Sequence, residues 1–486
     1  MTEQPAAVVG IPPAPPARLE PDAIGVAQDT VIGLASSAPA ATVGLSLFLL
    51  ASVTAYGSGP ILILTAIPML IIANAYRRLN MWNANCGASF EWVGRAINPY
   101  LGFLTGWLMI VAYIIGTVSG VEVLGPSVLA VFGSSTASSW AYVGIGAAVV
   151  LAMLVIAIVG IKITARTQVG LALVEYLIVI GFSIAGLVYV FSHHGAGIVH
   201  PSTAWLRPSG IGGKGSAVAG FLAAVFVYGG WDGSMYVNEE VKHRRINPGR
   251  AAIFAVLFLT IFYTLAQVGL QGVVSPKQLS NNSASAPVYI AGVLGGSSGE
   301  KAMALAIALS VIATTGTGIV LTARIIYGMA SYRVLPEFLS NVSRRYATPV
   351  WSSLVVGFLL IAIAAVYLLT SSVQNAFDNV IAITGLLFSI FYILTALAMI
   401  VYYRRRVFSS LWNTIVLAIL PLGAAGFLGW VLVKSIIAAP GSQQWSLIGV
   451  IILGVVLMLS ARFIQRSPFF QISRESDSGQ AAAKHA

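Results

Sequence analysis

The sequence predicts an all-α protein that crosses a membrane about twelve times. Of its 486 residues, 58% are hydrophobic and only 8% are charged, whereas a soluble globular protein carries about 25% charged residues. Apolar stretches of about 20 residues, long enough for a helix to cross a hydrocarbon core of about 30 Å, recur along the chain. These stretches lie near 31–55, 58–76, 98–123, 140–161, 167–191, 216–238, 251–272, 301–330, 350–369, 379–402, 411–433 and 445–463.

The basic residues indicate how the helices are oriented. When the N-terminus is placed inside, 21 of the 26 Lys and Arg residues fall in inner segments and 5 fall in outer loops. This is a strong positive-inside bias. We therefore expect an integral protein of the cell membrane with both termini in the cytoplasm. The net charge of +11 then faces the anionic lipids of the inner leaflet, so the bilayer accounts for it and no nucleic-acid partner is expected.

The composition also divides the chain. Residues 1–28, rich in Pro and Ala, and residues 467–486, which are polar, are expected to be disordered cytoplasmic tails around a transmembrane domain at 29–466. The chain has one cysteine, Cys86, which rules out an internal disulfide. It falls between the second and third spans on the inner side, where a thiol stays reduced.

Two of the twelve stretches are interrupted, and they lie five spans apart. The first contains small residues and a proline at 35–41 (ASSAPAA), and a proline inside a helix removes a backbone N–H and clashes with the preceding turn. The sixth contains Gly-Gly-Trp-Asp-Gly at 229–233. Interruptions at corresponding places in two halves are the best sequence indication of an inverted-repeat transporter and its binding site. Small residues also permit close helix packing, but the matched spacing favours a pair of discontinuous helices.

Five segments in the right order resemble the amino acid–polyamine–organocation (APC) superfamily of permeases, and the likeness runs from about Asp29 to Arg406. The first-span segment is the weakest match, because Ser-Ser-Ala-Pro-Ala stands where the family has Gly-Ser-Gly. The other four are 87–99 and 101–107 (GASFEWVGRAINP, LGFLTGW) entering the third span, 160–166 (GIKITAR) entering the fifth, 228–231, 239–242 and 247–251 (YGGW, EEVK, NPGRA) around the sixth, and 323–330, 335–336 and 348–350 (ARIIYGMA, LP, TPV) after the eighth.

The resemblance implies the LeuT-type fold. In this fold two inverted repeats of five helices, here 29–191 and 216–402, are followed by two additional helices, here 411–463. The first and sixth spans unwind near the middle of the membrane. Unwound backbone persists there only when its free N–H and C=O groups line a cavity.

An amino acid suits such a cavity. Its carboxylate can accept hydrogen bonds at the N-terminus of a half-helix, and its ammonium group can donate to carbonyls at a half-helix C-terminus. Phe226 matches an aromatic residue that covers the substrate in relatives, although ordinary helix packing would also explain it. On the basis of the resemblance, the expected substrate-binding residues are Ser36, Ser37, Ala38, Phe226, Tyr228, Gly229 and Gly230. Asp232 is added because it belongs to the broken segment itself.

Charged and hydroxyl groups inside the spans are candidates for ion coupling. Glu175 lies nine residues beyond Arg166, or about 13 Å along a helix, and many prokaryotic relatives have a lysine at the matching place. A buried carboxyl group here would carry a coupling proton or pair with a cation, or it is simply held neutral by a neighbouring hydroxyl. Thr314 and Thr315 stand where sodium-dependent relatives have hydroxyl ligands, but threonines also bond their own helix. Protons are thus the expected coupling ion, with sodium less favoured, and no cofactor is expected.

Two further carboxyl groups have alternative interpretations. Asp232 either favours a cationic substrate or caps the half-helix that restarts after the break. Glu122 lies near the outer end of the third span, where we expect interfacial solvation.

The expected function is proton-coupled secondary active transport of amino acids by alternating access. The alternative is a transporter of the same fold for polyamines or other organic cations, which Asp232 and Glu175 suggest. An enzyme is not expected, because none of the five histidines lies in a span and no motif has metal-ligand or nucleophile spacing. A channel is disfavoured because no pore-lining repeat occurs. Residues 124–139 contain no cysteine, so a disulfide-linked heavy chain, as in some eukaryotic relatives, is not expected.

Overall fold

The computed structural model describes residues 18–44, 58–134, 137–194, 197–207, 214–275, 278, 282, 286–370 and 373–472. Within these residues the structure is helical and contains no strand, apart from one isolated bridge between Ile24 and Val241. The principal helices are α1 (Val26–Ala35), α3 (Ser58–Trp82), α4 (Ser89–Ala96), α5 (Pro99–Val131), α6 (Ser139–Val159), α7 (Ile161–Ser192), α8 (Lys214–Tyr228), α9 (Asn247–Leu270), α11 (Ala286–Ser331), α12 (Val350–Thr370), α13 (Val373–Tyr402), α16 (Leu420–Ala438) and α17 (Gly441–Phe463).

Shorter elements connect or extend these helices. They are the 3₁₀ helices η2 (Thr203–Leu206), η4 (Trp231–Glu240), η6 (Glu337–Ser340) and η8 (Pro468–Gln471), the single turns α14 (Arg404–Val407) and α15 (Leu411–Thr414), and the π-helical turn η7 (Ile415–Ile419). η7 joins α15 to α16, so residues 411–438 form one span.

Ten helices among the described residues are long and apolar enough to cross a membrane. The two predicted spans that do not appear among them are 31–55 and 216–238. These are the two interrupted stretches, and the structure divides each into shorter pieces. The prediction of an all-α polytopic membrane protein with discontinuous first and sixth spans is therefore confirmed.

Local sequence explains where several helices begin and end. α5 starts at Pro99, and the side chain of Asn98 accepts a hydrogen bond from the N–H of Tyr100, which satisfies a donor that the helix cannot. α6 and α7 meet at Gly160, whose φ of +144° ends one helix and allows the next to begin at once. α11 is interrupted at Gly295 and Gly296, which divide it into a short first helix and a long span.

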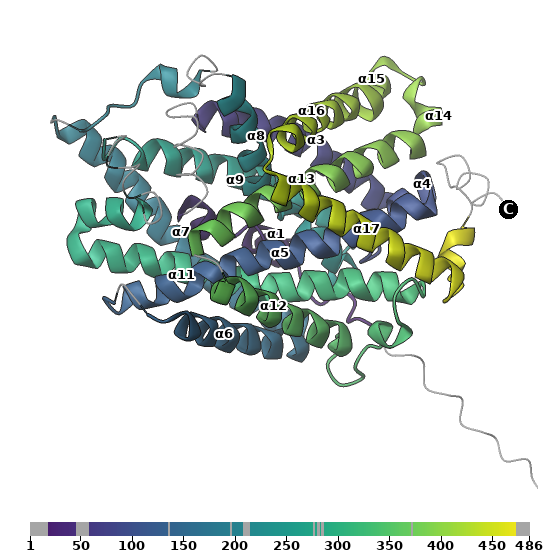
Figure 1. Ribbon diagram of the computed structural model, residues 1–486. Helices are drawn as coiled ribbons and strands as arrows, with labels where there is room; N and C mark the ends of the chain where they lie inside the picture. The colour runs from purple at the N-terminus through teal and green to yellow at the C-terminus, as the bar shows by residue number, and fades with distance from the viewer. Residues whose placement is uncertain are drawn as a thin grey trace, which may run out of the picture.

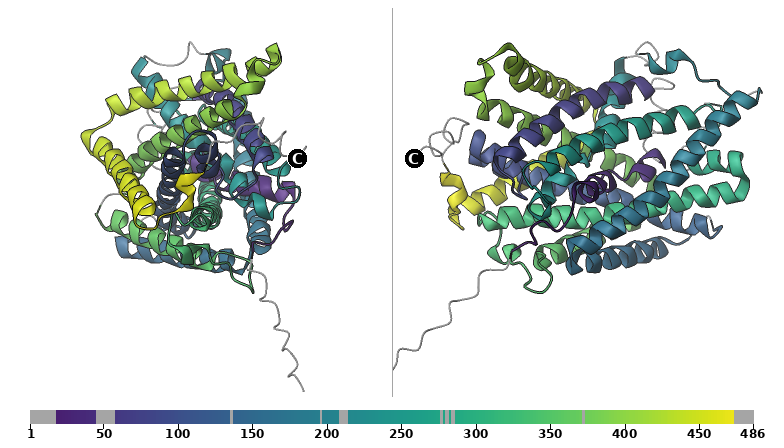
Figure 2. Two further views of the ribbon diagram at one scale, coloured as in Figure 1. Left: turned by 90° about the vertical axis from the view of Figure 1, so that its right-hand side faces the viewer. Right: turned by 180° about the vertical axis from the view of Figure 1, so that it is seen from behind.

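The helices run side by side along the long axis of the molecule (Figure 1), and the view along this axis shows α16 and α17 at the periphery (Figure 2). α5 and α11 pack against each other at the centre, α13 packs against α5, and α7 packs against α11. In the most apolar stretch of α11, 83% of the residues are buried within the protein, whereas in that of α17 only 22% are buried. The central helices therefore carry the protein core, and the outer ones present their apolar side chains to lipid.

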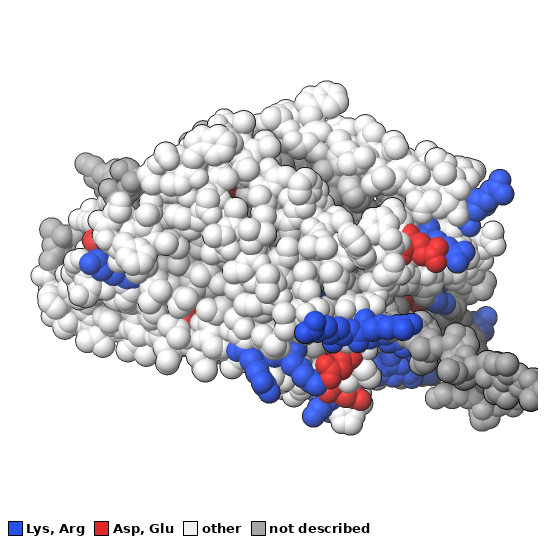
Figure 3. Space-filling view, turned by 90° about the horizontal axis from the view of Figure 1, so that it is seen from below, with Lys and Arg blue, Asp and Glu red and all other residues white. Residues whose placement is uncertain are grey.

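Charge is concentrated at one end of the bundle. On the face shown in Figure 3, most Lys and Arg side chains lie in the right-hand half and along its lower edge, and the upper and left-central surface is almost free of charge. The right-hand end is the end of α4 and α14 in Figure 1. We call this the basic end.

Parts of both expected tails belong to the packed structure. Glu20 forms an ion pair with Lys162, and the backbone of Ile24 is hydrogen-bonded to the chain just after η4. At the other terminus, Phe469 in η8 is buried and stacks on Phe90 with ring centroids 4.3 Å apart. The packed structure thus includes residues before 29 and residues after 466.

Candidate functional site

The first span unwinds between Ser36 and Ala38. α1 ends at Ala35, and a second helical segment begins at Pro39 and is described as far as residue 44. Two tight turns bridge the interruption, because the N–H groups of Ser37 and Ala38 bond to carbonyls only three residues back. Ala38 has a φ of +45°, a left-handed conformation that is uncommon for a residue with a side chain. Pro39 suits the start of the new segment, because it has no N–H to satisfy.

The sixth span unwinds at Gly229 and Gly230. α8 ends at Tyr228, and the chain resumes as η4 at Trp231. Gly230 has a φ of +105°, and a methyl group there would lie 2.6 Å from the carbonyl oxygen of Ser36. Glycine is required at this position because of both its backbone conformation and the close approach of the first span.

The two interruptions face each other. The hydroxyl of Ser36 lies 2.5 Å from the carbonyl oxygen of Gly230 and 2.9 Å from that of Gly33. One hydroxyl proton can satisfy one of these carbonyls at a time. The free backbone groups of the two breaks are therefore gathered into one small region of the protein interior.

A cavity lies at this junction. The space open to the centre of a water molecule is about 60 Å³, and about 10–15 Å³ of such space admits one water. The cavity is therefore small, with room for a few waters or one compact ligand. Its lining residues are Ser36, Ser37, Ala38, Ala41, Thr42, Ala112, Tyr113, Gly116, Thr117, Ser119, Gly120, Val123, Phe226, Gly229, Thr314, Gly318 and Phe388.

The lining contains no Asp, Glu, Lys, Arg or His among the described residues. Its polar groups are serine and threonine hydroxyls and backbone atoms at the helix breaks. Its apolar walls are small aliphatic residues and three aromatic rings, those of Tyr113, Phe226 and Phe388. Such a site can bind a small ligand whose charges are met by backbone groups, and it offers no side-chain countercharge.

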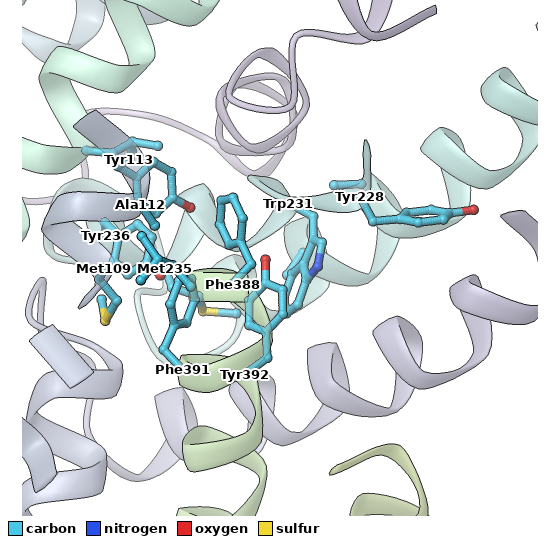
Figure 4. Packing of buried hydrophobic residues seen from close by; sticks show 14 of the residues in the cluster. Met109, Ala112, Tyr113, Tyr228, Trp231, Met235, Tyr236, Phe388, Phe391 and Tyr392 are labelled. Atoms are coloured by element: carbon cyan, nitrogen blue, oxygen red, sulfur yellow. The ribbon is translucent and has the colours of Figure 1, made fainter. Parts of the chain in front are cut away.

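Six of the eleven residues expected from the sequence line this cavity: Ser36, Ser37, Ala38, Phe226, Gly229 and Thr314. Gly230 lies behind it, and its carbonyl accepts from Ser36. Tyr228 points away from the aromatic cluster (Figure 4), and its hydroxyl donates to Leu62 or Thr260 on neighbouring helices. Asp232, Glu175 and Thr315 also lie outside the lining.

The two threonines of α11 have different surroundings. The hydroxyl of Thr314 lies 2.8 Å from the carbonyl oxygen of Ala35, at the end of α1, and 2.9 Å from that of Ser310. Thr315 donates to Val311 in its own helix. Thr314 therefore contacts the unwound first span, and Thr315 does not.

Glu175 on α7 is fully buried, and neither carboxyl oxygen has a hydrogen-bond partner among the described residues. The hydroxyl of Ser310 and the backbone N–H of Ala40 lie close enough to interact with the carboxyl group, and Ala40 belongs to the first turn of the helical segment after the break. The first N–H groups of a helix have no partner within it. The carboxyl group thus lies beside the start of the second half of span 1, behind the cavity wall.

Asp232 is fully buried directly after the break in span 6. Three tyrosine hydroxyls donate to its carboxyl group. The hydroxyl of Tyr113 is 2.9 Å from Oδ1 and that of Tyr392 is 2.8 Å from Oδ1, while Tyr236 donates to Oδ2. The carboxyl group is therefore occupied by protein donors and does not face the cavity.

The structure differs from the sequence expectation for Glu122. We expected this side chain to be solvated at the interface, but it is fully buried and its carboxyl oxygens have no partner among the described residues. α5 continues to Val131, nine residues beyond Glu122, so the residue lies deeper than the boundary of the apolar stretch suggested.

Eleven of the seventeen lining residues were not singled out as site residues from the sequence, and Tyr113, Thr117 and Phe388 are among them. Tyr113 and Thr117 are one helical turn apart on α5, and the hydroxyl of Thr117 donates to the carbonyl of Tyr113 at 2.7 Å. Two polar residues four apart in an otherwise apolar span were an available signal. Phe388 on α13 carried no such signal, because an aromatic residue in a span also packs against lipid or other helices.

Buried polar contacts hold the end of η4 in place. At the end of η4, Glu240 forms a bidentate ion pair with Arg324 of α11, with Nε–Oε2 and Nη2–Oε1 distances of 2.6 and 3.0 Å, and both side chains are fully buried. The neighbouring Glu239 accepts a hydrogen bond from the backbone N–H of Cys86 at 3.0 Å. These contacts attach the second half of span 6 to α11 and to the segment that follows α3.

Comparison with known proteins agrees with this geometry. Residues 28–460 match the model of the amino acid permease family. The chain is 21% identical over 375 residues to the D-serine/D-alanine/glycine transporter of Escherichia coli K12, which covers 75% of this chain and 78% of the relative. It is 26% identical over 330 residues to the serine/threonine exchanger of Bacillus subtilis, which covers 66% of this chain and 69% of the relative.

A shorter match links the chain to a mammalian protein. It is 29% identical over 173 residues to the Asc-type amino acid transporter 1 of Mus musculus, which covers 35% of this chain and 31% of the relative. The aligned segment thus spans about a third of the mammalian relative's length, whereas the family model matches most of the chain. The chain belongs to the amino acid permease family.

Proposed function

We propose that this protein is a secondary active transporter of small neutral amino acids, driven by a proton gradient. The observation that carries the proposal is the small cavity between two unwound helices, lined by hydroxyls, backbone groups and aromatic rings without a charged side chain. The relatives in E. coli and B. subtilis, whose names specify D-serine, D-alanine, glycine, serine and threonine, support a cargo of this size.

Backbone groups at the breaks can recognise both charges of an amino acid. Ala41 lines the cavity in the first turn of the segment that starts at Pro39, where N–H groups lack helical partners and favour a carboxylate. At the end of α8 the carbonyl of Phe226 accepts from the N–H of Gly229 at 2.8 Å, whereas the last two carbonyls, those of Val227 and Tyr228, are helix-end groups that favour an ammonium group. The substrate side chain then lies among Tyr113, Phe226 and Phe388.

A cationic cargo, the alternative suggested by the sequence, has less support. An organic cation or a polyamine in this cavity would need a countercharge for its additional positive group, and none lines the site among the described residues. Asp232, the residue that suggested such a cargo, is occupied by three tyrosines. Neutral amino acids are therefore the preferred class.

We assign proton coupling to Glu175. An ionised carboxylate without partners is too costly to bury, so this side chain is protonated or holds a cation. It lies beside Ala40, so a change in its charge acts directly on the half-helix that begins at Pro39. Sodium is less favoured, because Thr314 places its hydroxyl against the carbonyls of Ala35 and Ser310, and no carboxylate lines this part of the cavity.

We place the protein in the cell membrane with both termini in the cytoplasm. The gathering of Lys and Arg at one end of the bundle (Figure 3) supports this orientation under the positive-inside rule. The basic end would then be the cytoplasmic side, and in the structure described here it is closed by η4. Transport by alternating access requires that the halves of spans 1 and 6 move so that this end opens.

The test is uptake by proteoliposomes containing the purified protein. Labelled alanine, serine, arginine and putrescine are supplied under a proton gradient alone and under a sodium gradient alone. We expect accumulation of alanine and serine with the proton gradient only. Uptake of putrescine or arginine without alanine would replace the cargo proposed here, and accumulation that ignores the proton gradient would refute the coupling.

Glu175→Gln tests the coupling residue, with Glu122→Gln as the matched control, since Glu122 is equally buried and unpaired but lies near Tyr367 of α12, whereas Glu175 lies near Ala40 of span 1. Glu175→Gln should abolish accumulation against a gradient while exchange of internal for external alanine continues. Glu122→Gln should retain accumulation. Full accumulation in Glu175→Gln would remove this residue from the mechanism.

A further inference from the structure

Four buried polar side chains converge beneath the cavity. They are Asp232 and the three tyrosines Tyr113, Tyr236 and Tyr392, which donate to both of its oxygens. We call this group the Asp232–tyrosine cluster. Its members come from α5, from η4 and from α13, so one carboxyl group is bonded to three separate elements. All four side chains are buried.

The cluster satisfies its own hydrogen bonds. A carboxylate accepts about four hydrogen bonds and donates none, and each tyrosine hydroxyl has one proton to donate. The three hydroxyls are therefore committed to Asp232, in hydrogen bonds that a charged acceptor strengthens. Tyr113 is the only member that lines the cavity among the described residues. Because the hydroxyl of Tyr113 donates to Asp232, it is mainly the ring of Tyr113 that forms the cavity wall.

Ring contacts extend the cluster to a second wall of the cavity. Phe388, which lines the cavity, packs edge-on against Tyr113 with centroids 5.8 Å apart and stacks on Tyr392 at 5.6 Å. Tyr392 in turn stacks on Trp231 at 5.3 Å. Figure 4 shows these rings grouped around Phe388, with Tyr113 on one side and Tyr392 and Trp231 on the other. Two of the three aromatic walls thus depend on the same carboxyl group.

We propose that Asp232 is a positioning residue that holds the rings of Tyr113 and Phe388 in place, and that it thereby limits the size of the neutral side chain that the site accepts. This inference rests on the proposed transport of amino acids. In it Asp232 does not touch the cargo. The hydroxyl of Tyr236, outside the cavity, affects selectivity through Asp232, since Tyr236→Phe keeps the ring that packs edge-on against Tyr113 at 5.4 Å.

The consequence can be separated from a general loss of stability. Tyr113→Phe keeps the ring but removes its attachment to Asp232, so the wall can move back and admit a larger side chain. Tyr236→Phe removes one donor from a tyrosine that does not line the cavity. Asp232→Asn keeps the size of the side chain, but its NH₂ group forces one hydroxyl to act as acceptor. All three variants should shift selectivity in the same direction.

The experiment measures kcat/KM for phenylalanine and for alanine in the same proteoliposomes. Taking the ratio of the two removes any effect of the amount of folded protein. Tyr332→Phe is the control, because it removes a hydroxyl that donates to a carboxylate, Glu91, at 2.6 Å near the basic end. We expect the phenylalanine-to-alanine ratio to rise about tenfold in the cluster variants, a range typical of altered apolar pockets, and to stay within about twofold of the wild type in the control.

Several outcomes would overturn the inference. One is an unchanged phenylalanine-to-alanine ratio in Tyr113→Phe and Tyr236→Phe while both variants still transport. These two variants lose only a hydroxyl, so they keep the test available if Asp232→Asn does not fold. Another is a selective loss of arginine uptake in Asp232→Asn with alanine uptake intact, which would place the carboxylate against the cargo. A wild-type protein that takes up no amino acid would instead defeat the proposed function, and this inference with it.

Discussion

The buried ion pair between Glu240 and Arg324 provides the sharpest test of how the basic end is closed. In Glu240→Gln the Arg324 guanidinium loses its countercharge while it stays fully buried. Removing one partner from a buried pair costs about 3–5 kcal/mol, because the remaining charge is left uncompensated. If this cost falls only on the closed state, the closed-to-open equilibrium shifts by about a hundredfold to several thousandfold.

The chain contains its own reporter for this opening. Cys86 is the single cysteine, is fully buried, and lies in the segment that Glu239 holds by a hydrogen bond to the backbone. Burial, followed by the negative charges of Glu239 and Glu240, raises the pKa of the Cys86 thiol well above its usual range. Because the thiolate is the reactive form, the closed protein should react slowly with a maleimide.

The assay is the rate of maleimide labelling of Cys86, together with thermal unfolding in detergent. Glu240→Gln should label at least about a hundred times faster than the wild type and unfold at a lower temperature. Glu337→Gln is the control, because Glu337 pairs with Arg333 at 3.6 Å with both side chains exposed, and exposed pairs contribute little.

Two further measurements decide what the result means. Removing Glu240 also removes a charge that raises the pKa of Cys86, so labelling is followed over a pH series to separate reactivity from exposure. The double variant Glu240→Leu with Arg324→Met removes both charges and should restore much of the stability. Unchanged labelling and unchanged unfolding in Glu240→Gln would refute the assignment of this pair to the closure.

Three other outcomes are expected. Gly230→Ala should abolish uptake and destabilise the protein, because the added methyl would lie 2.6 Å from the carbonyl oxygen of Ser36, at a residue with a φ of +105°. Gly423→Ala, where an added methyl meets nothing within 4 Å, should leave uptake and stability unchanged. Equal behaviour of the two variants would contradict the close approach of the breaks. Wild-type labelling of Cys86 should rise about tenfold per pH unit and keep rising beyond about pH 8.5, where an exposed cysteine levels off; a plateau at that pH would show that the thiol is not buried. Thr314→Val should lower the unfolding temperature without creating or removing a response to sodium, since its hydroxyl is bonded to the end of α1, and a lost sodium response would point to an ion site.

The fold was predictable because its signals are local. The length of an apolar stretch identifies a span, and Pro39 and the glycines at 229 and 230 identify the two broken spans. Neither signal depends on residues elsewhere in the chain. The ends of the ordered region were less predictable. Residues such as Ile24 and Phe469 are ordered through contacts with segments that lie far away in the sequence.

The candidate site was predictable mainly at the two breaks, and Thr314 on α11 is the one expected residue outside them that lines the cavity. Ser36, Ser37, Ala38, Phe226 and Gly229 line the cavity because they belong to the breaks. Side chains on unbroken helices depend on how those helices rotate against one another, which hydropathy does not reveal. For this reason Tyr113 and Phe388 were missed. The surroundings of Asp232 were hidden too, since they depend on three tyrosines up to 160 residues away.

The link between the N-terminal segment and η4 consists of main-chain atoms. The N–H of Ile24 donates to the carbonyl of Glu240 at 3.1 Å, and the N–H of Lys242 donates to the carbonyl of Ile24 at 2.9 Å. Nearly every amino acid supplies these groups, so the side chains at 24 and 242 can drift during evolution while the approach to span 1 stays joined to the exit of span 6. Proline, which has no N–H, is the one residue type that would remove a hydrogen bond from this connection.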